Sequence, residues 1–201
     1  MGLSLMALKQ AELRDDIQQR VANISIGAST LRGQGPPGFV RTAREFLMKL
    51  NLGELDNIDE EQFKNWLDEN TEKLMEKFPG AKKNWGAARK SMNVFLEHAF
   101  YDRFLAEEYK LYELEDFLEI PIDSHVNEGL LKNNNYDIRF DLPGWRGIKN
   151  LTPEDNEIYQ NCARYVAKKE GKSRIYLDLK FWRQITLENK LKPALEFIKQ
   201  K

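Results

Sequence analysis

Apolar side chains recur every three or four positions along most of the chain, which is the spacing of one face of an α-helix. This pattern predicts helices over residues 3–21, 39–50, 57–78, 87–105, 107–118, 124–132 and 152–171. The last stretch, 173–201, could begin as a strand but is more easily interpreted as helix. The stretch 27–38 carries four glycines and two prolines and is predicted to be a loop, and residues 133–151 are predicted to be irregular. The expected fold class is all-α.

Polar residues at two predicted helix starts support these assignments. Asp59 is placed to cap the helix that reaches residue 78, because a short carboxylate accepts hydrogen bonds from free backbone N–H groups. Thr152 precedes Pro153, a residue that favours the first helical position, and Gly171 marks the end of that helix.

The composition is that of one globular unit. The chain has 201 residues, of which 41% are hydrophobic and 31% charged, enough apolar material for a core. No apolar run approaches the roughly 18 residues that cross a bilayer, so we expect a soluble, cytoplasmic protein that does not contact membranes. A single cysteine, Cys162, excludes an internal disulfide and is expected to be buried. With only two histidines beside it, a Cys/His zinc site is not expected.

The net charge of −1 argues against nucleic-acid binding by bulk electrostatics. The charges are unevenly distributed, however. Cations dominate residues 73–90 and 164–201, whereas acids gather in 54–61 and 107–119. Any one of these runs is typical of a solvated helix face. Two basic segments on an otherwise acidic chain are also compatible with one surface that meets phosphate.

The stretch "LEIPIDSHV", residues 118–126, places Asp123 between a proline-fixed turn and a predicted helix. Taken alone, Asp123 is interpreted as the N-cap of that helix.

A second motif lies upstream in "WGAARKSMNVFLEHAF", residues 85–100. Together the two motifs resemble the helix-hairpin-helix (HhH-GPD) DNA glycosylase superfamily, in which a glycine-containing hairpin leads into a lysine-bearing helix and an apolar-Pro-apolar-Asp turn follows. Gly86 and Lys90 match the first pattern, and Asp123 and His125 match the second. The long separation of Lys90 from Asp123 is most similar to the archaeal-type 8-oxoguanine glycosylase/AP lyase branch.

The chain departs from the family pattern in two places. Its hairpin is degenerate, because "FPG" at 78–80 is separated from Gly86 by "AKKNW". No cysteine quartet follows Asp123, so the iron–sulfur cluster of the endonuclease III-like members is not expected. We expect no cofactor and no metal.

The resemblance implies a helical fold in which residues 1–201 form two lobes flanking a DNA-binding cleft. It also implies that Asp123 stabilises positive charge on the sugar while the base departs. Lys90 would attack C1′ to form a Schiff base, which makes the protein a glycosylase with AP lyase activity. Neighbouring Arg89 and partial burial are expected to favour the neutral amine that attacks.

Further candidate residues follow from the same resemblance. The loop "TLRGQGPPG" offers side chains to fill the gap left by an extruded base, namely Leu31, Arg32 and Gln34. The expected phosphate contacts are Lys82, Lys83, Gly86 and Arg89. The candidates for the base pocket are Trp85, His125, Trp145 and Trp182. The expected partner is double-stranded DNA containing a modified base, bound by a monomer.

Other interpretations stay open. The loop is equally compatible with a plain helix connection, and each tryptophan with a core position. The excised base is not identified, and a hypermodified base of phage DNA, removed as a defence, fits the same motifs. The chain is alternatively a non-catalytic helical DNA-binding module or a helical interaction protein.

Overall fold

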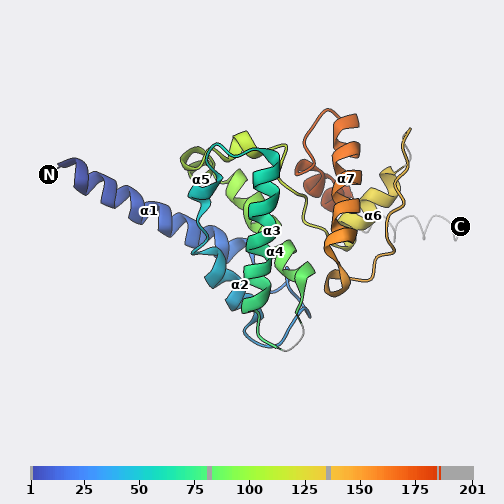
Figure 1. The fold of residues 1–201 in the computed structure, drawn as a ribbon, viewed down its shortest axis with the longest axis horizontal. Coiled ribbons are helices and arrows are strands. Elements are labelled where there is room, and N and C mark those ends of the chain that lie inside the picture. The colour runs from blue at the N-terminus through green and yellow to red at the C-terminus, as the bar shows by residue number, and fades with distance from the viewer. Residues whose placement is uncertain (1, 81–82, 135–136, 185, 187–201) are drawn as a thin grey trace, which may run out of the picture.

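The computed structural model describes residues 2–80, 83–134, 137–184 and 186, and within these ranges the chain is helical and contains no strand (Figure 1). The all-α prediction is therefore confirmed. The elements are α1 (Gly2–Ser25), α2 (Phe39–Leu47), η1 (Leu52–Leu55), α3 (Glu60–Lys77), α4 (Trp85–Tyr101), α5 (Arg103–Glu108), η2 (Leu111–Leu114), α6 (Ser124–Asn133), η3 (Ile148–Asn150) and α7 (Pro153–Lys169). Residues 176–184 form a further helical segment, as expected for the start of the C-terminal stretch.

The predicted capping residues occupy the helix starts. Asp59 accepts a hydrogen bond from the backbone N–H of Gln62, whose side chain in turn bonds the backbone N–H of Asp59, so α3 begins with a capping box. Thr152 accepts from the backbone N–H of Asp155, and Pro153 is the first residue of α7. These starts were predicted correctly because capping depends only on neighbours in the sequence.

The middle of the chain differs from the prediction. The helix predicted over 87–105 ends at Tyr101, because Asp102 leaves helical geometry and caps α5 through a hydrogen bond 3.1 Å long to a backbone N–H of that helix. The helix predicted over 107–118 is wrong as well. Lys110 has a φ of 51°, in the left-handed region, and only the short η2 follows it.

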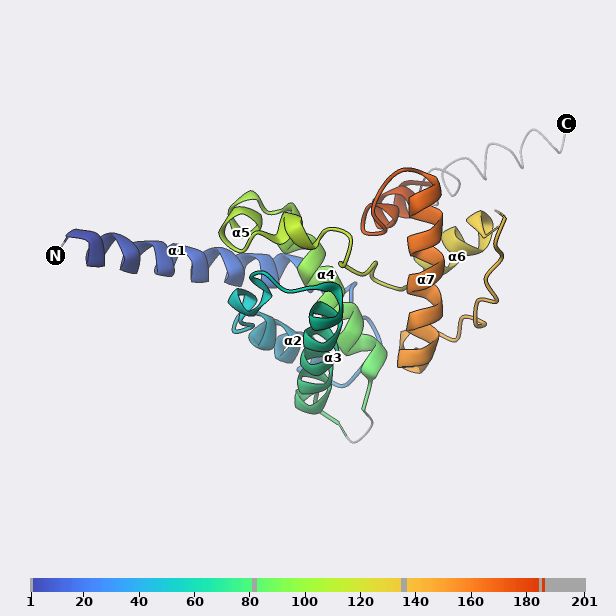
Figure 2. The ribbon, with the colours of Figure 1, turned by 45° about the horizontal axis from the view of Figure 1, so that its top comes forward.

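The buried side chains form two hydrophobic clusters. The first lies among α1 to α5, and α4 packs against α1, α2 and α3 within it. The second lies around α6 and α7 and contains Cys162, which is buried as expected. Figures 1 and 2 show α6 and α7 set to one side of the bundle formed by α1 to α5. A chain with two lobes needs one hydrophobic cluster in each, and two clusters are present. That DNA binds between them stays a prediction.

Two segments connect the clusters. Residues 118–122 run from Leu118, in the first cluster, to Ile122, in the second. The chain returns after α7, where Ile175 packs in the first cluster while Leu177 and Phe181 pack in the second. The 176–184 helix therefore lies where the two clusters meet. Among the described helices, none combines the length and apolar character needed to cross a membrane.

Candidate functional site

Lys90 and Asp123 form an ion pair between the two clusters. Lys90 comes from the middle of α4 and Asp123 directly precedes α6, and Lys90 Nζ lies 3.1 Å from Asp123 Oδ2. The lysine side chain is 10% exposed and the aspartate side chain 24% exposed. The pair is thus largely shielded from solvent, while part of the aspartate side chain stays accessible, as a group that meets a ligand requires.

Asp123 also caps α6. Its Oδ1 accepts hydrogen bonds from the backbone N–H groups of His125, at 2.9 Å, and Val126, at 3.1 Å. The predicted N-cap is confirmed. The other oxygen, Oδ2, takes no part in capping and pairs with Lys90. Because both oxygens are held by donors, the carboxylate has a fixed orientation. The catalytic role of the residue stays a prediction.

Two further acids, missed by the sequence analysis, surround this pair. Burial, together with repulsion from Asp178 and Asp123, raises the pKa of Glu97 to about 9. Burial and the Asp123 carboxylate raise the pKa of Asp178 to about 7, although attraction to Lys90 acts in the opposite direction. Glu97 is therefore protonated at neutral pH, and Asp178 holds a proton more readily than an ordinary aspartate.

The sequence alone could have indicated Glu97 but not Asp178. Glu97 follows Lys90 by seven residues, two turns of α4, so the spacing alone places both on one face of the helix. Asp178 comes from the 176–184 helix, far along the chain, and no local pattern links it to Lys90. Only the return of the chain between the clusters brings it to the site.

His125 lies near the ion pair, and Trp182 is on the helix that carries Asp178; their roles in a base pocket stay predictions. His125 Nδ1 is 4.0 Å from Asp123 Oδ1, and its side chain is 43% exposed. Trp182 follows Asp178 by one helical turn and therefore shares its face of the 176–184 helix. The residue is 59% exposed, which is unusual for a tryptophan and leaves aromatic surface accessible on the helix that carries Asp178.

The other two candidate tryptophans are engaged in packing. Trp85 carries the Arg89 guanidinium over its ring, at 5.3 Å from the ring centre. Trp145 packs edge-on against Tyr159, with ring centres 6.3 Å apart, and is a partly buried residue that contacts the second cluster. The prediction of Trp85 and Trp145 as base-pocket residues receives no support from these positions.

Arg89 is directed away from Lys90, which corrects its predicted role. Its side chain is 3% exposed and donates to Glu119, at 2.9 and 3.1 Å, to Asp68 at 2.7 Å and to Thr71 at 3.0 Å. Successive residues of an α-helix point about 100° apart, so neighbours in sequence face different surroundings. A guanidinium held in this way is not available to a phosphate and cannot favour a neutral Lys90 by direct repulsion.

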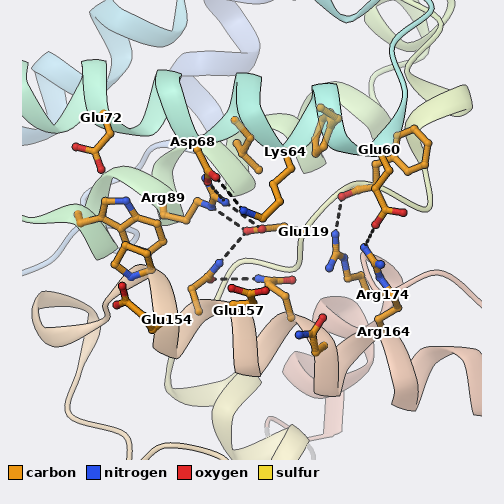
Figure 3. A pocket seen from close by; sticks show the side chains of 18 residues that line it. Glu60, Lys64, Asp68, Glu72, Arg89, Glu119, Glu154, Glu157, Arg164 and Arg174 are labelled. Carbon is orange, nitrogen blue, oxygen red and sulfur yellow. Dashed lines mark hydrogen bonds and ion pairs between the residues drawn. The ribbon is translucent and has the colours of Figure 1, made fainter.

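Figure 3 shows the cleft into which Arg89 points, between α3 and α7. The cleft measures about 470 Å³ and contains neither Lys90 nor Asp123. Acids outnumber cations along it, and one of them, Glu60 of α3, pairs with Arg164 of α7 across it. Its acidic lining makes it unsuited to the DNA backbone.

Gly86 also differs from its prediction as a phosphate contact. It is buried beneath η3, and a Cβ atom added to it would lie 2.1 Å from the carbonyl oxygen of Ile148 and 2.9 Å from Cβ of Leu151. The absence of a side chain therefore lets η3 pack against the first turn of α4. This close approach leaves the glycine no surface to offer to a phosphate.

The loop that precedes α2 contacts the residue that caps the start of α4. Asn84 Nδ2 donates to the backbone oxygen of Gln34 at 2.9 Å. Leu31 is buried in the first cluster, which contradicts its predicted insertion into DNA. Arg32 is exposed, and Gln34 Oε1 is buried with no hydrogen-bond partner in the described part of the chain. Arg32 and Gln34 as DNA contacts stay predictions.

Of the two lysines predicted to contact phosphates, the structure describes only Lys83. Lys83 is exposed and pairs with Glu76 at 2.5 Å. Lys82 lies outside the described residues. In the described ranges, no group of three or more His, Cys, Asp and Glu side chains is arranged to hold a metal ion.

Comparison with protein-family models, with curated proteins and with solved structures gave no match to this chain.

Proposed function

We propose that this protein is a DNA glycosylase of the helix-hairpin-helix type, with AP lyase activity through Lys90. The observation that carries the proposal is the contact of Lys90 with Asp123, which are 33 residues apart in sequence and 3.1 Å apart in space. These are the two residues that the two sequence motifs single out. A lysine amine and an oriented carboxylate, shielded between two lobes, are the groups that this chemistry needs.

The reaction begins with a base turned out of the duplex, because neither group reaches a stacked nucleotide. The bond between C1′ and the base nitrogen breaks, and its electron pair leaves with the base, which takes up a proton. The Asp123 carboxylate stabilises the positive charge that develops on the sugar. Lys90 Nζ, after giving up its ammonium proton, bonds to C1′, and opening of the sugar ring gives the Schiff base from which strand cleavage proceeds.

The surrounding acids suit the proton movements in this scheme. Asp178 titrates near pH 7 and interacts with Lys90, so its carboxylate is a suitable acceptor for the lysine proton. Glu97 is protonated at neutral pH and is a suitable hydrogen-bond donor. The exposed ring of Trp182 offers a surface on which an extruded base can stack.

The test is base release from duplexes containing 8-oxoguanine, uracil, thymine glycol or a modified cytosine, with enzyme in excess. We expect release from at least one duplex, and loss of release in Asp123→Asn. Lys110→Gln is the matched control, because Lys110 also pairs with a distant aspartate, Asp56, at 2.8 Å. DNA affinity without release from any duplex would favour a non-catalytic binding module, and no salt-dependent affinity would favour an interaction protein.

A further inference from the structure

The segment that connects the two clusters and ends at Asp123 is held by side chains along its length. Arg174 donates to the backbone oxygens of Leu118, at 2.8 Å, and Phe117, at 2.6 Å. Gln160 accepts from the backbone N–H of Ile120 at 3.1 Å and donates to its oxygen at 2.8 Å. The backbone approaching Asp123 therefore has little freedom to shift relative to α7.

Glu119 lies in the middle of this segment and gathers donors from both clusters. Arg89 donates to both of its oxygens, and Asn93 and Asn156 donate to Oε2 at 3.0 and 3.2 Å. Burial would raise the pKa of Glu119, but Arg89 and Arg174 outweigh it and lower that pKa below its usual value. Glu119 is thus a buried, fully charged carboxylate that joins α4, α7 and the connecting segment (Figure 3).

The same two pieces of chain carry the Lys90–Asp123 pair. Arg89 is the residue before Lys90, and Glu119 lies four residues before Asp123. A bidentate contact between guanidinium and carboxylate fixes distance and orientation together. A buried ion pair is often no more stabilising than apolar side chains of similar volume. The role that suits the Arg89–Glu119 pair better is to fix the position of the connecting segment relative to α4.

We propose that Arg89 and Glu119 are positioning residues that hold Asp123 against Lys90. This inference rests on the proposed function, because it assigns the pair a role in the reaction of Lys90 and Asp123. The ion pair sets the register between α4 and the connecting segment, and through it the geometry of the reacting groups.

The first test is single-turnover base release by Glu119→Asp, which keeps the charge but shortens the side chain by one methylene. We expect the rate constant to fall about 10- to 100-fold, since a displacement of about 1 Å at a reacting group has effects of this size. The dissociation constant for DNA should change less than about twofold, because Glu119 is buried. Arg164→Gln is the control, because it breaks another ion pair across the same cleft without touching this segment. A wild-type rate in Glu119→Asp would overturn the proposal.

The second test needs no DNA and remains informative if Glu119→Asp loses stability. Methylation of Lys90 by formaldehyde and borohydride, followed by mass spectrometry, reports how firmly its ammonium is held. We expect Lys90 to react several-fold faster in Glu119→Asp and in the double variant Arg89→Met/Glu119→Met, as in Asp123→Asn. Unchanged reactivity in Glu119→Asp and the double variant, beside faster reaction in Asp123→Asn, would overturn the positioning role. Failure of wild-type protein to release any base would instead contradict the proposed function, whatever the methylation result.

Discussion

Lys90 Nζ and Asp123 Oδ2 are 3.1 Å apart, although one side chain projects from α4 in the first cluster and the other caps α6 beside the second. The contact therefore exists only while the two clusters keep their relative placement. Asp123 connects helix capping with the ion pair, since its two oxygens serve one purpose each. This division makes the chemistry of Asp123 separable from its structural role.

Asp123→Asn should separate these two roles. Asparagine caps helices about as well as aspartate, so α6 should keep its N-cap. The free energy of unfolding in a denaturant titration should fall by about 1 to 3 kcal/mol, because the largely buried Lys90 loses its carboxylate partner. The rate of base release should fall by about 10²- to 10⁴-fold, because the variant lacks the negative charge that stabilises the sugar cation. A folded variant that retains the wild-type rate would exclude Asp123 as the catalytic carboxylate.

Glu97→Gln should change how stability depends on pH. The pKa of Glu97 is raised to about 9 from an ordinary 4.5, so between these values the folded protein holds a proton that the unfolded chain releases. The free energy of unfolding of the wild type should therefore decrease as pH rises through this range. Glutamine does not titrate, so the variant should be more stable than wild type by roughly 1 to 3 kcal/mol at pH 8. Urea titrations at pH 5 and pH 8 measure the difference, with the exposed Glu69→Gln as control.

Gly86→Ala should destabilise the fold. The added methyl would overlap the carbonyl oxygen of Ile148, a backbone atom that cannot turn aside, and would force η3 away from α4. We expect a loss of about 2 kcal/mol or more in the free energy of unfolding. Gly144→Ala is the matched control, because a Cβ there meets no atom within 4 Å. Equal stability of the two variants would show that η3 is not packed as described.

Trp182→Ala should affect DNA binding and Trp145→Ala should affect stability. Trp182 is exposed, so its loss should leave the melting temperature nearly unchanged and weaken binding of DNA that contains the excised base by about 1 to 3 kcal/mol. Trp145 packs against Tyr159, so its loss should lower the melting temperature. Unchanged DNA affinity in Trp182→Ala would remove this residue from the proposed base pocket.

Local signals in the sequence were sufficient for the helix starts but not for the middle of the chain. The caps at Asp59, Asp123 and Thr152 were predicted because capping involves residues two or three positions apart. The interruption at Lys110 was missed, since its left-handed backbone is not signalled by a glycine or asparagine.

The candidate site was predictable only in part for a similar reason. Two motifs pointed to Lys90 and Asp123, which the fold brings into contact. Asp178 joins them through packing between distant segments, which carries no sequence signal. Arg89 was misassigned because adjacency in sequence does not mean a shared face of a helix, and its true partner, Glu119, lies beyond a turn whose path no pattern revealed.

The most direct test of the proposed function is borohydride trapping of the protein on duplexes that carry candidate modified bases. A Schiff base between Lys90 and C1′ would be reduced to a stable covalent adduct, visible as a shift on a denaturing gel. We predict an adduct with wild-type protein on at least one duplex, its loss in Lys90→Gln, and its retention in Lys110→Gln. An adduct that persists in Lys90→Gln, or the absence of adduct on every duplex from which the wild type releases a base, would contradict the assignment of Lys90 as the nucleophile.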